Sequence, residues 1–518
     1  MKSTRIYVFL ALLTNCFVFS YAGAFPEVTK ISDTMVDSDA RTLPGGTYGY
    51  AINGLSFQQD AVVTHNGWQY VAYYCDINDE GYVCVARREL PSGSWQIIVT
   101  DHKLSTTWDA HNVVSIGICP NDGTIHLSFD HHGGTLNYRV SDAGVATDPC
   151  SITWSADRFG SVRHYLEMGE SYSNVTYPRF WQTPDGDLQF GYRIDGSGNG
   201  DWAMVDYDAA TGLWSNTRTV ISRMGTYSDS LGGPSYFRNA YMNNLAYGPG
   251  GKLHATWCWR EDAGGANHDI MYAYSEDGGH VWLNGKSNTI RISTGNQGGE
   301  PQTLLTLSFG GGEDNVVGRA TGDPATEELI TLDSPGITVV ELDRYYGLMN
   351  QQAQAVDPQG RIHTVMWHCT EETYQQYPRN GLRWGPQGAR RYFHYWRDSQ
   401  GVWHRNELPG YVGSRPKLFI RSNGDAFLIY QSRLPEDEDP TDGGIYFVYG
   451  DFTICAATAQ SRWTDWQIIH VEPGFFLNEM LGNLYRFEQE EVLSVMVQES
   501  PWYAGQSTPL RILDFSLN

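Results

Sequence analysis

Residues 123–129 read Gly123-Thr124-Ile125-His126-Leu127-Ser128-Phe129, a turn glycine followed by alternating apolar and polar residues. Glycine permits a tight turn, and this alternation is typical of a β-strand. The same order of glycine, aliphatic residue and histidine returns at residues 251–254 and 360–363. Turn glycines lead into apolar segments at Gly67, Gly123, Gly186, Gly251, Gly360 and Gly424. Their intervals of 56, 63, 65, 109 and 64 residues predict a repeated β unit with one long interruption.

Tryptophans give a second marker with the same period. Each follows a short turn and precedes a polar segment, at Trp95, Trp154, Trp214, Trp282, Trp403 and Trp463. The intervals are 59, 60, 68, 121 and 60 residues, and the long one falls where the glycine marker also has its long interval. A unit of this length has room for about four strands, which is the size of a propeller blade. We therefore predict an all-β fold, a seven-bladed β-propeller that forms a single domain over residues 25–518.

Six repeats are directly visible, so the seventh has to be placed. We expect it at the C-terminus, with residues 491–497 and 510–515 as strands and a further strand supplied by the N-terminal segment, which would close the ring. We then expect residues 290–347, rich in Gly, Asp and Glu, to be an insertion. The alternative is a blade within residues 290–347, and if both segments are blades the count is eight.

One repeat carries a complete Asp-box, S-x-D-x-G-x-x-W, at residues 275–282. In propellers this motif joins the two ends of a hairpin turn at the outer rim. Its role is structural, so it supports the fold and does not by itself indicate a sialidase.

Composition and charge narrow the functional classes. The chain has 56 Gly, 17 Trp and 32 Tyr, with few segments of helical periodicity, as expected for an all-β protein. Its formal net charge of −24 disfavours nucleic acid, which requires a basic face. An anionic substrate would need a local basic pocket set against this field.

The first residues have the features of an export signal. Lys2 and Arg5 precede a mostly apolar segment over residues 6–19, and Ala22-Gly23-Ala24 offers a cleavage site. The apolar segment is too short to span a bilayer. We expect a secreted chain, extracellular or periplasmic, that begins near Phe25 and acts as a monomer without a membrane span.

Seven cysteines remain after this signal. Cys75 and Cys84 flank a short predicted hairpin loop, so a disulfide between them is possible. The odd number leaves at least one free thiol.

Histidines concentrate in one short region of the chain. His111, His126, His131 and His132 fall within 22 residues, and histidine is suited to proton transfer near neutral pH. His126 occupies a repeat position shared with His254 and His363, which favours structural packing. Further polar and aromatic candidates near predicted strands are Tyr177, Arg193, Tyr236, Arg238 and Tyr241.

Taken together, these motifs resemble a known group of proteins. Asp-x-His-Asn at 109–112, Phe-Asp-His-His at 129–132, Leu-His-x-x-Trp at 253–257, Asn-His-Asp-Ile at 267–270 and the Asp-box resemble the BNR-repeat propellers that include the ulvan lyases. The resemblance covers most of the predicted mature chain and is greatest to polysaccharide lyase families 24 and 25, which are seven-bladed propellers. Those enzymes use two histidines about twenty residues apart, then a tyrosine and an arginine sixteen residues further on. Here His111 lies 20 residues before His131 and 21 before His132, and Tyr177 lies 16 before Arg193.

The resemblance implies cleavage of a uronate-containing polysaccharide by β-elimination. Arg193 would neutralise the uronate carboxylate, since a guanidinium group can bind a carboxylate through two hydrogen bonds. His111 would remove the proton at C5 and Tyr177 would protonate the departing O4, although these two roles can be exchanged. One of His131 and His132 would orient the carboxylate. The residues expected to bind neighbouring sulfate or uronate groups are Arg179, Tyr236, Arg238, Tyr241 and Arg260.

A metal ion is a separate question, because elimination needs none if Arg193 neutralises the acid. His254, Cys258 and His268, with His363 or Cys369, could form a structural zinc site if the blades bring them together. The alternative is that they are packed core residues. The resemblance makes a structural zinc or calcium ion plausible, and no catalytic cofactor is expected.

Two other functions fit a propeller with these residues. One is a glycoside hydrolase that removes rhamnose from glucuronate, and the other is a non-catalytic carbohydrate-binding propeller. The Tyr177 and Arg193 pair beside two histidines favours elimination over hydrolysis. A sialidase is disfavoured because the sequence shows no convincing arginine triad with a Tyr/Glu pair.

Overall fold

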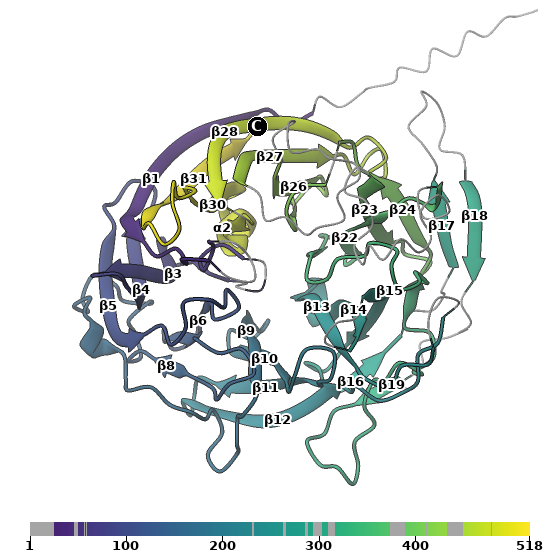
Figure 1. Cartoon of the computed structure of the whole chain (residues 1–518), viewed down its shortest axis with the longest axis horizontal. Coiled ribbons are helices and arrows are strands. Elements are labelled where there is room, and N and C mark those ends of the chain that lie inside the picture. Colours follow the sequence, from purple (N-terminus) through teal and green to yellow (C-terminus); the bar gives the residue numbers. More distant parts are fainter. Residues whose placement is uncertain are drawn as a thin grey trace, which may run out of the picture.

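Antiparallel sheets stand around a central opening in the computed structural model of the chain (Figure 1). The structure describes residues 25–45, 50–55, 57, 60–229, 233–262, 266–284, 289–293, 303–308, 316–372, 389–410, 412–432, 449–477 and 479–518. The predicted export signal, residues 1–24, lies outside this part of the chain. The fold is all-β and propeller-like, as predicted, and within its sheets most strands pair with their neighbours in sequence.

The sheets of the first half follow the chain closely. Its strands are β2 (Val62–His65), β3 (Trp68–Ile77), β4 (Glu80–Glu89) and β5 (Gln96–Lys103), then β6 (Val114–Ile118), β7 (Ile125–Phe129) and β8 (Tyr138–Val140), then β9 (Val175–Gln182), β10 (Leu188–Ile194), β11 (Trp202–Asp208) and β12 (Leu213–Ile221). The first strand of a sheet lies nearest the opening and the last at the rim, as β9 and β12 show in Figure 1.

The second half continues this arrangement. Its strands are β13 (Arg238–Tyr247), β14 (Leu253–Glu261), β15 (Asn267–Ser275) and β16 (Val281–Leu283), then β21 (Ala353–Val356), β22 (Ile362–Cys369), β23 (Arg390–Arg397) and β24 (Trp403–Glu407), then β25 (Lys417–Ile420), β26 (Ala426–Gln431), β27 (Tyr449–Ala457) and β28 (Gln467–Leu477). Helical segments are short, namely η1 (Ala156–Arg158), η2 (Pro249–Gly251) and α2 (Leu484–Glu490).

The ends of the chain close the ring. Strands β29 (Leu481–Gly482), β30 (Val492–Gln498) and β31 (Thr508–Leu517) pair in that order, and β1 (Val28–Ala40) pairs antiparallel with β31 from Val28 opposite Leu517 to Ala40 opposite Thr508. The predicted C-terminal strands and the strand borrowed from the N-terminus are thus confirmed. A single pair, Ala40 opposite Cys75, joins β1 to β3 and makes one eight-stranded sheet of this closure and the first repeat.

The segment predicted as an insertion, residues 290–347, adds its described strands to two neighbouring sheets. Strands β19 (Val316–Arg319) and β20 (Thr338–Val340) pair with β16 and β15. Strands β17 (Thr289–Ser293) and β18 (Thr303–Ser308) form a hairpin whose first strand runs parallel to β24.

Burial explains why inner and outer strands differ in sequence. Every residue of β14 except Arg260 is buried, because neighbouring sheets pack on both of its faces. The rim strand β28 alternates between exposed and half-buried positions, as a strand with one solvated face does. The repeat histidines are also buried, as predicted for His126, whose ring nitrogens contact Thr124 Oγ1 at 2.6 Å and the Tyr138 hydroxyl at 2.7 Å.

The Asp-box has its predicted structural role. Asp277 Oδ1 accepts hydrogen bonds from the backbone N–H groups of His280 and Val281 at 3.2 and 2.8 Å. Ser275 Oγ accepts one from Gly279 N, and the buried Trp282 indole donates to Gly279 O. These bonds join the two ends of the β15–β16 turn.

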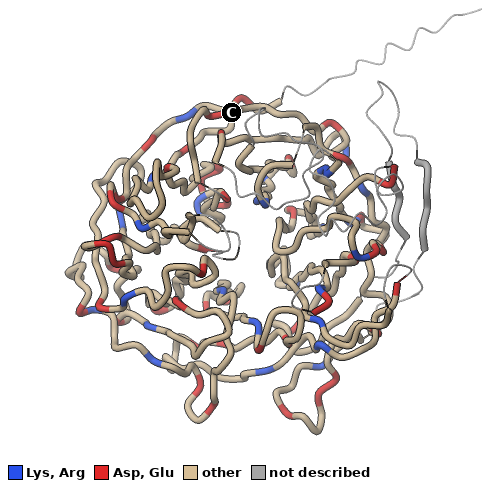
Figure 2. Tube along the Cα trace, viewed as in Figure 1, with Lys and Arg blue, Asp and Glu red and all other residues tan. Residues whose placement is uncertain are grey.

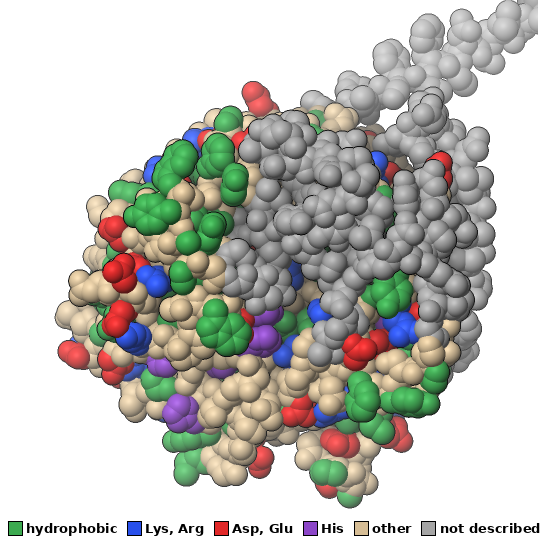
Figure 3. All heavy atoms as spheres, viewed as in Figure 1, with side chains coloured by type: hydrophobic (Ala, Val, Ile, Leu, Met, Phe, Trp, Pro, Cys, Tyr) green, Lys and Arg blue, Asp and Glu red, His purple; other side chains and the backbone are tan. Residues whose placement is uncertain are grey.

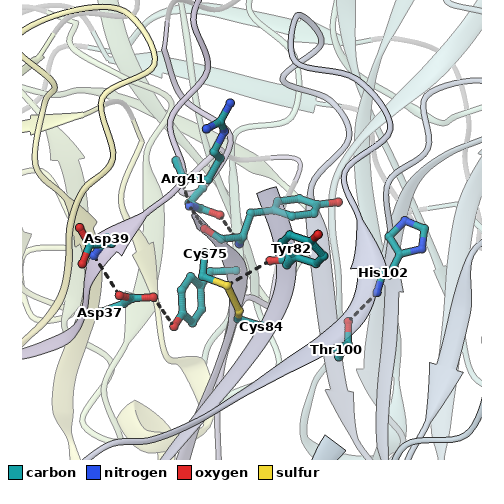
Figure 4. The surroundings of a disulfide bond; sticks show 11 residues. Asp37, Asp39, Arg41, Cys75, Tyr82, Cys84, Thr100 and His102 are labelled. Carbon is teal, nitrogen blue, oxygen red and sulfur yellow. Dashed lines mark hydrogen bonds between the residues drawn. A yellow bond between two sulfur atoms is a disulfide. The ribbon is translucent and has the colours of Figure 1, made fainter. Parts of the chain in front are cut away.

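A disulfide, which the sequence left as a possibility, forms between Cys75 on β3 and Cys84 on β4 (Figure 4). Described cysteines without a disulfide are Cys119, Cys150, Cys258, Cys369 and Cys455. None of the helices in the described ranges is long and apolar enough to cross a membrane.

Candidate active site

The candidate residues meet where loops and strand ends converge beside the central opening. His111 lies in the loop before β6, His132 follows β7, Tyr177 lies near the start of β9, and Arg193 lies near the end of β10. Because β9 and β10 are antiparallel, the start of one and the end of the other meet at the same edge, with Arg193 opposite Thr176. Figure 3 shows histidine side chains (purple) gathered near the centre of this face.

Asp109 joins two of the histidines. The Nδ1 atoms of His111 and His132 lie 2.5 and 2.7 Å from its two carboxylate oxygens, and the two imidazole rings stack with centres 3.9 Å apart. Phe57 stacks on the other side of His111, with ring centres 4.9 Å apart. Since the Nδ1–H group of each ring donates to Asp109, Nε2 of neutral His111 is the nitrogen without a proton.

The site keeps His111 neutral and Asp109 charged. Burial lowers the pKa of His111 to about 4, although the hydrogen bond to Asp109 acts in the opposite direction. Burial would raise the pKa of Asp109, but its hydrogen bonds to His111 and His132 outweigh this and hold the pKa below its ordinary value. A neutral imidazole backed by a carboxylate is the arrangement of a general base.

His132, and not His131, belongs to this cluster. The His132 side chain is 25% exposed, whereas His131 is buried, with its Nε2 3.1 Å from Ser128 Oγ. Burial lowers the pKa of His131 to about 4. The side chains of His131 and His132 point in different directions. This difference selects His132, which sequence spacing from His111 could not do.

Tyr177 has an unusual backbone that directs its side chain toward the histidines. Its φ is +58°, a left-handed conformation that non-glycine residues rarely adopt, and it lies at a register shift in the pairing of β9 with β10. Its ring centre lies 6.0 Å from that of His111 and 6.4 Å from that of His132. Such strain is typical of functional sites, where the surrounding structure holds it in place.

Arg193, near the end of β10, completes the group. Its guanidinium carbon lies 4.8 Å from the centre of the Tyr177 ring, and its Nη atoms donate to the Tyr241 hydroxyl at 3.3 Å and to Thr176 Oγ1 at 3.1 Å. Burial would raise the pKa of Tyr241, but Arg260 and Arg193 lower it below its ordinary value. Cationic groups that face this side of the cluster can receive a carboxylate.

Of the residues expected to bind substrate, Tyr241 and Arg260 lie at the cluster. The Arg260 guanidinium carbon is 5.6 Å from the centre of the Tyr241 ring. Arg179 is buried and donates to Asn243 O, and burial lowers its pKa to about 9. Among the charged groups around it, Asp60 has the largest effect on its pKa and acts against burial.

Arg238 and Tyr236 do not take the expected positions. Arg238 is fully buried, forms a double hydrogen bond with Glu261, and uses its remaining N–H groups on the carbonyls of Arg223, Gly225 and Ser235. No N–H group is left for substrate, which corrects its assignment. Tyr236 is 59% exposed, and no described contact links it to the cluster.

The residues considered for a zinc site are not brought together. His254 and Cys258 lie four positions apart on β14, a separation of about 13 Å. His254 contacts the Tyr272 hydroxyl, whereas His268 lies between Glu261 and Asp269. Burial raises the pKa of the Cys258 thiol, which disfavours the thiolate that zinc requires. They therefore fit packed core residues.

Within the described ranges, the one group with metal-ligand spacing is Asp109, His111 and His132, whose ligand atoms lie within 4.8 Å of one another. The Asp109 carboxylate already accepts from both imidazoles. The group therefore fits a hydrogen-bonded network that holds two bases.

Sequence reasoning assigned no role to Asp109, although it stands in the quoted Asp-x-His-Asn motif. Its spacing of two residues from His111 was the available signal, since it also lets Asp109 Oδ1 accept from the His111 backbone N–H at 3.0 Å. Phe57 and Ser197, which contacts the Tyr241 hydroxyl at 2.9 Å, come from loops whose sequences carry no such signal.

Curated relatives of this chain include ulvan lyases. The long isoform from Pseudoalteromonas sp. (strain PLSV) is 25% identical over 340 residues, which covers 56% of this chain and 33% of the relative. The short isoform from Alteromonas sp. (strain LOR) is 24% identical over 314 residues, covering 49% of this chain and 57% of the relative. The match thus spans about a third of the long relative.

Solved structures share the fold. The polysaccharide lyase Uly1 superposes with a TM-score of 0.60 at 15% identity, covering 95% of this chain and 100% of that one. An ulvan lyase of polysaccharide lyase family 25 bound to -[GlcA(1-4)Rha3S]- superposes with a TM-score of 0.59 at 11% identity, covering 93% and 95%.

A family model matches the repeats directly. The region of the match, residues 68–410, begins at β3 and ends after β24, and it contains the candidate site and the Asp-box. It accounts for well over half of the chain. The chain belongs to the BNR repeat-containing family.

Proposed function

We propose that the protein is a polysaccharide lyase that cleaves ulvan by β-elimination at uronic acid residues and leaves unsaturated uronyl oligosaccharides. The observation that carries the proposal is the pair of histidines, His111 and His132, that Asp109 links and that lies beside Tyr177 and Arg193. The named ulvan lyases among the relatives support the choice of substrate.

The reaction needs the C5 proton to become acidic. In this proposal the guanidinium of Arg193 binds the uronate carboxylate and stabilises the charge that develops when that proton leaves. Arg260 lies on the other side of Tyr241 and adds positive charge there. Figure 2 shows Lys and Arg on segments that border the opening, within a chain of net charge −24.

Proton transfer then falls to His111 and Tyr177. Nε2 of neutral His111 takes the proton from C5, and the electron pair of that C–H bond forms the C4–C5 double bond as the bond from C4 to O4 breaks. Tyr177 donates its hydroxyl proton to O4, and Asp109 stabilises the imidazolium. The low pKa of His111 keeps its imidazole neutral, so that Nε2 is available to accept the proton, and the mechanism requires no cofactor.

The surrounding architecture is proposed to be a seven-bladed propeller. The eight-stranded sheet would then count as two blades, β2 to β5 and β29 to β31 with β1, since only one described residue pair joins them. We also propose that the export signal is cleaved near Ala24 and that the secreted chain acts as a monomer.

The test is incubation of the purified protein with ulvan, with ultraviolet absorbance of the unsaturated uronate as the readout. We expect the absorbance to rise with the unchanged protein. It should not rise with the His111→Ala and Tyr177→Phe variants. New reducing ends without the chromophore would indicate a hydrolase instead. Binding without any cleavage, unchanged in both variants, would indicate a carbohydrate-binding propeller.

A further inference from the structure

A second polar cavity lies at the end of β14 opposite to Arg260. Its volume is about 440 Å³, and its walls come from the turns before β14, between β21 and β22, and between β23 and β24. Strand β14 runs from this cavity, at Lys252 and His254, to the catalytic cluster at Arg260, so about 25 Å separates the two sites.

Two cations in the cavity lie on adjacent aromatic rings. Lys252 Nζ is 4.1 Å from the centre of the Tyr274 ring, the Arg397 guanidinium carbon is 5.7 Å from that of Tyr272, and the two tyrosine rings stack 6.2 Å apart. Contacts of this kind hold a cation in place without neutralising it. Arg361 lines the same cavity.

Unpaired polar atoms also mark the cavity. His254 is 2% exposed and lines the wall, and within the described residues its Nε2 has no hydrogen-bond partner. The same holds for one terminal nitrogen of Arg397. Buried polar atoms in proteins are nearly always paired, so these atoms point to a ligand group. Burial, with the charges of Lys252 and Arg397, lowers the pKa of His254 to about 3, although Asp357 acts in the opposite direction.

The acidic neighbours of the cavity already have partners. Asp398 binds His404 Nε2 at 2.8 Å and the backbone N–H groups of Gln400 and Val402. Asp357 binds Arg361 and His363. Glu276 reaches Lys252 at 3.1 Å, but both side chains are exposed, and such pairs contribute little. Among the described residues, the guanidinium group of Arg397 donates a hydrogen bond only to the carbonyl oxygen of Gly401.

We propose that this cavity is a second, non-catalytic binding site for an anionic group, the sulfate ester or carboxylate of an acidic polysaccharide. It rests on the proposed function only for the class of polymer. A long chain held at two places on one protein dissociates more slowly than one held at a single place, because the second contact is intramolecular. The cavity would therefore increase retention on polymer and leave cleavage of short fragments unchanged.

The test compares two variants of the full chain, Lys252→Ala/Arg397→Gln and a control, Arg158→Gln, which removes an exposed cation paired with Asp142. Affinity electrophoresis through gels containing ulvan, dextran sulfate, polygalacturonate or neutral dextran measures retention, with His111→Ala added for the ulvan gels to prevent cleavage. The rate on short ulvan fragments is measured in the variants that keep His111.

We expect retention by an anionic polymer to fall at least twofold in the double variant and to stay unchanged in the control, with equal rates on short fragments. Loss only in dextran sulfate identifies a sulfate site, and loss only in polygalacturonate identifies a carboxylate site. Equal retention of all variants overturns the proposal. A fall in the rate on short fragments as large as the fall in retention overturns it as well. If the variants differ in retention but the protein cleaves no polysaccharide, the lyase function is overturned and the proposal of this binding site stands.

Discussion

Two adjacent histidines with different environments give the sharpest test at the scale of single residues. His132 shares Asp109 with His111, whereas His131 is buried against Ser128. We expect His132→Ala to lower kcat on ulvan by about 100-fold with little change in stability, because His132 stacks on His111 and shares Asp109 with it, and a small misplacement of a reacting group costs about this much. His131→Ala should keep most of the activity and lower the free energy of unfolding. Equal kinetic effects in both variants would contradict this assignment.

The pH dependence follows from the pKa of two groups. The base must be neutral, and the pKa of His111 is about 4, so kcat/KM should fall on the acid side near pH 4 and not near the ordinary value for histidine. On the alkaline side, the lowered pKa of Tyr241 makes it an anion beside Arg193 below its ordinary range, where it competes with the substrate carboxylate.

Rates measured on ulvan from pH 3.5 to 10 check both limits. In Tyr241→Phe the alkaline loss should move to higher pH while the acid limb stays in place. An acid limb near pH 6.5 in the wild-type protein would rule out a buried neutral His111 as the base.

At the scale of single residues, sequence spacing could predict a contact only where the two residues lie close together in the sequence. Tyr177 and Arg193 lie on paired strands, where Arg193 is opposite Thr176, the residue before Tyr177, and both residues entered as candidates through the spacing that the family resemblance supplied. Spacing could not separate His131 from His132, because the direction of a side chain after a strand depends on the local backbone. Arg238 was misplaced because its partner, Glu261, is brought to it by pairing between β13 and β14, which the sequence pattern does not reveal.

At the scale of elements, the Asp-box shows how one turn stabilises a sheet. Asp277 accepts from two backbone N–H groups that would lose their partner in Asp277→Ala. We expect this variant to lose about 1–3 kcal/mol of unfolding free energy and to keep its activity, because the turn lies away from the catalytic cluster. Denaturant unfolding measures the change, with the exposed neighbour Glu276→Ala as the control. A loss of activity at unchanged stability would contradict a structural role.

Elements were predictable where their residues repeat. The turn glycines and tryptophans mark the same hairpins in successive sheets, since each repeat has to bury a strand between two neighbours. The segment over residues 290–347 has no such marker, and its described strands pair with neighbouring sheets, one of them in parallel. Edge pairing of this kind depends on which strand is left uncovered nearby, and the sequence of the segment does not carry that information.

The whole molecule depends on one strand from the other end of the chain. Closure by β1 was predictable because the C-terminal segments supply too few strands for a complete repeat. Without β1, the backbone groups of β31 would lie at an open edge, and such edges associate with other chains. The site is sensitive to this closure, because β1 leads into the loops that carry Phe57 against His111.

We therefore expect a chain that begins at residue 41 to form oligomers, to melt at lower temperature and to lose activity. A chain that begins at residue 25 should keep its oligomeric state, its melting temperature and its activity. Size-exclusion chromatography, thermal unfolding and the ulvan assay measure them. Adding residues 25–40 as a separate peptide should restore monomers and part of the activity, because the pairing with β31 needs no covalent link to the rest of the ring. A shortened chain that stays monomeric with an unchanged melting temperature would show that β1 is not needed to close the ring.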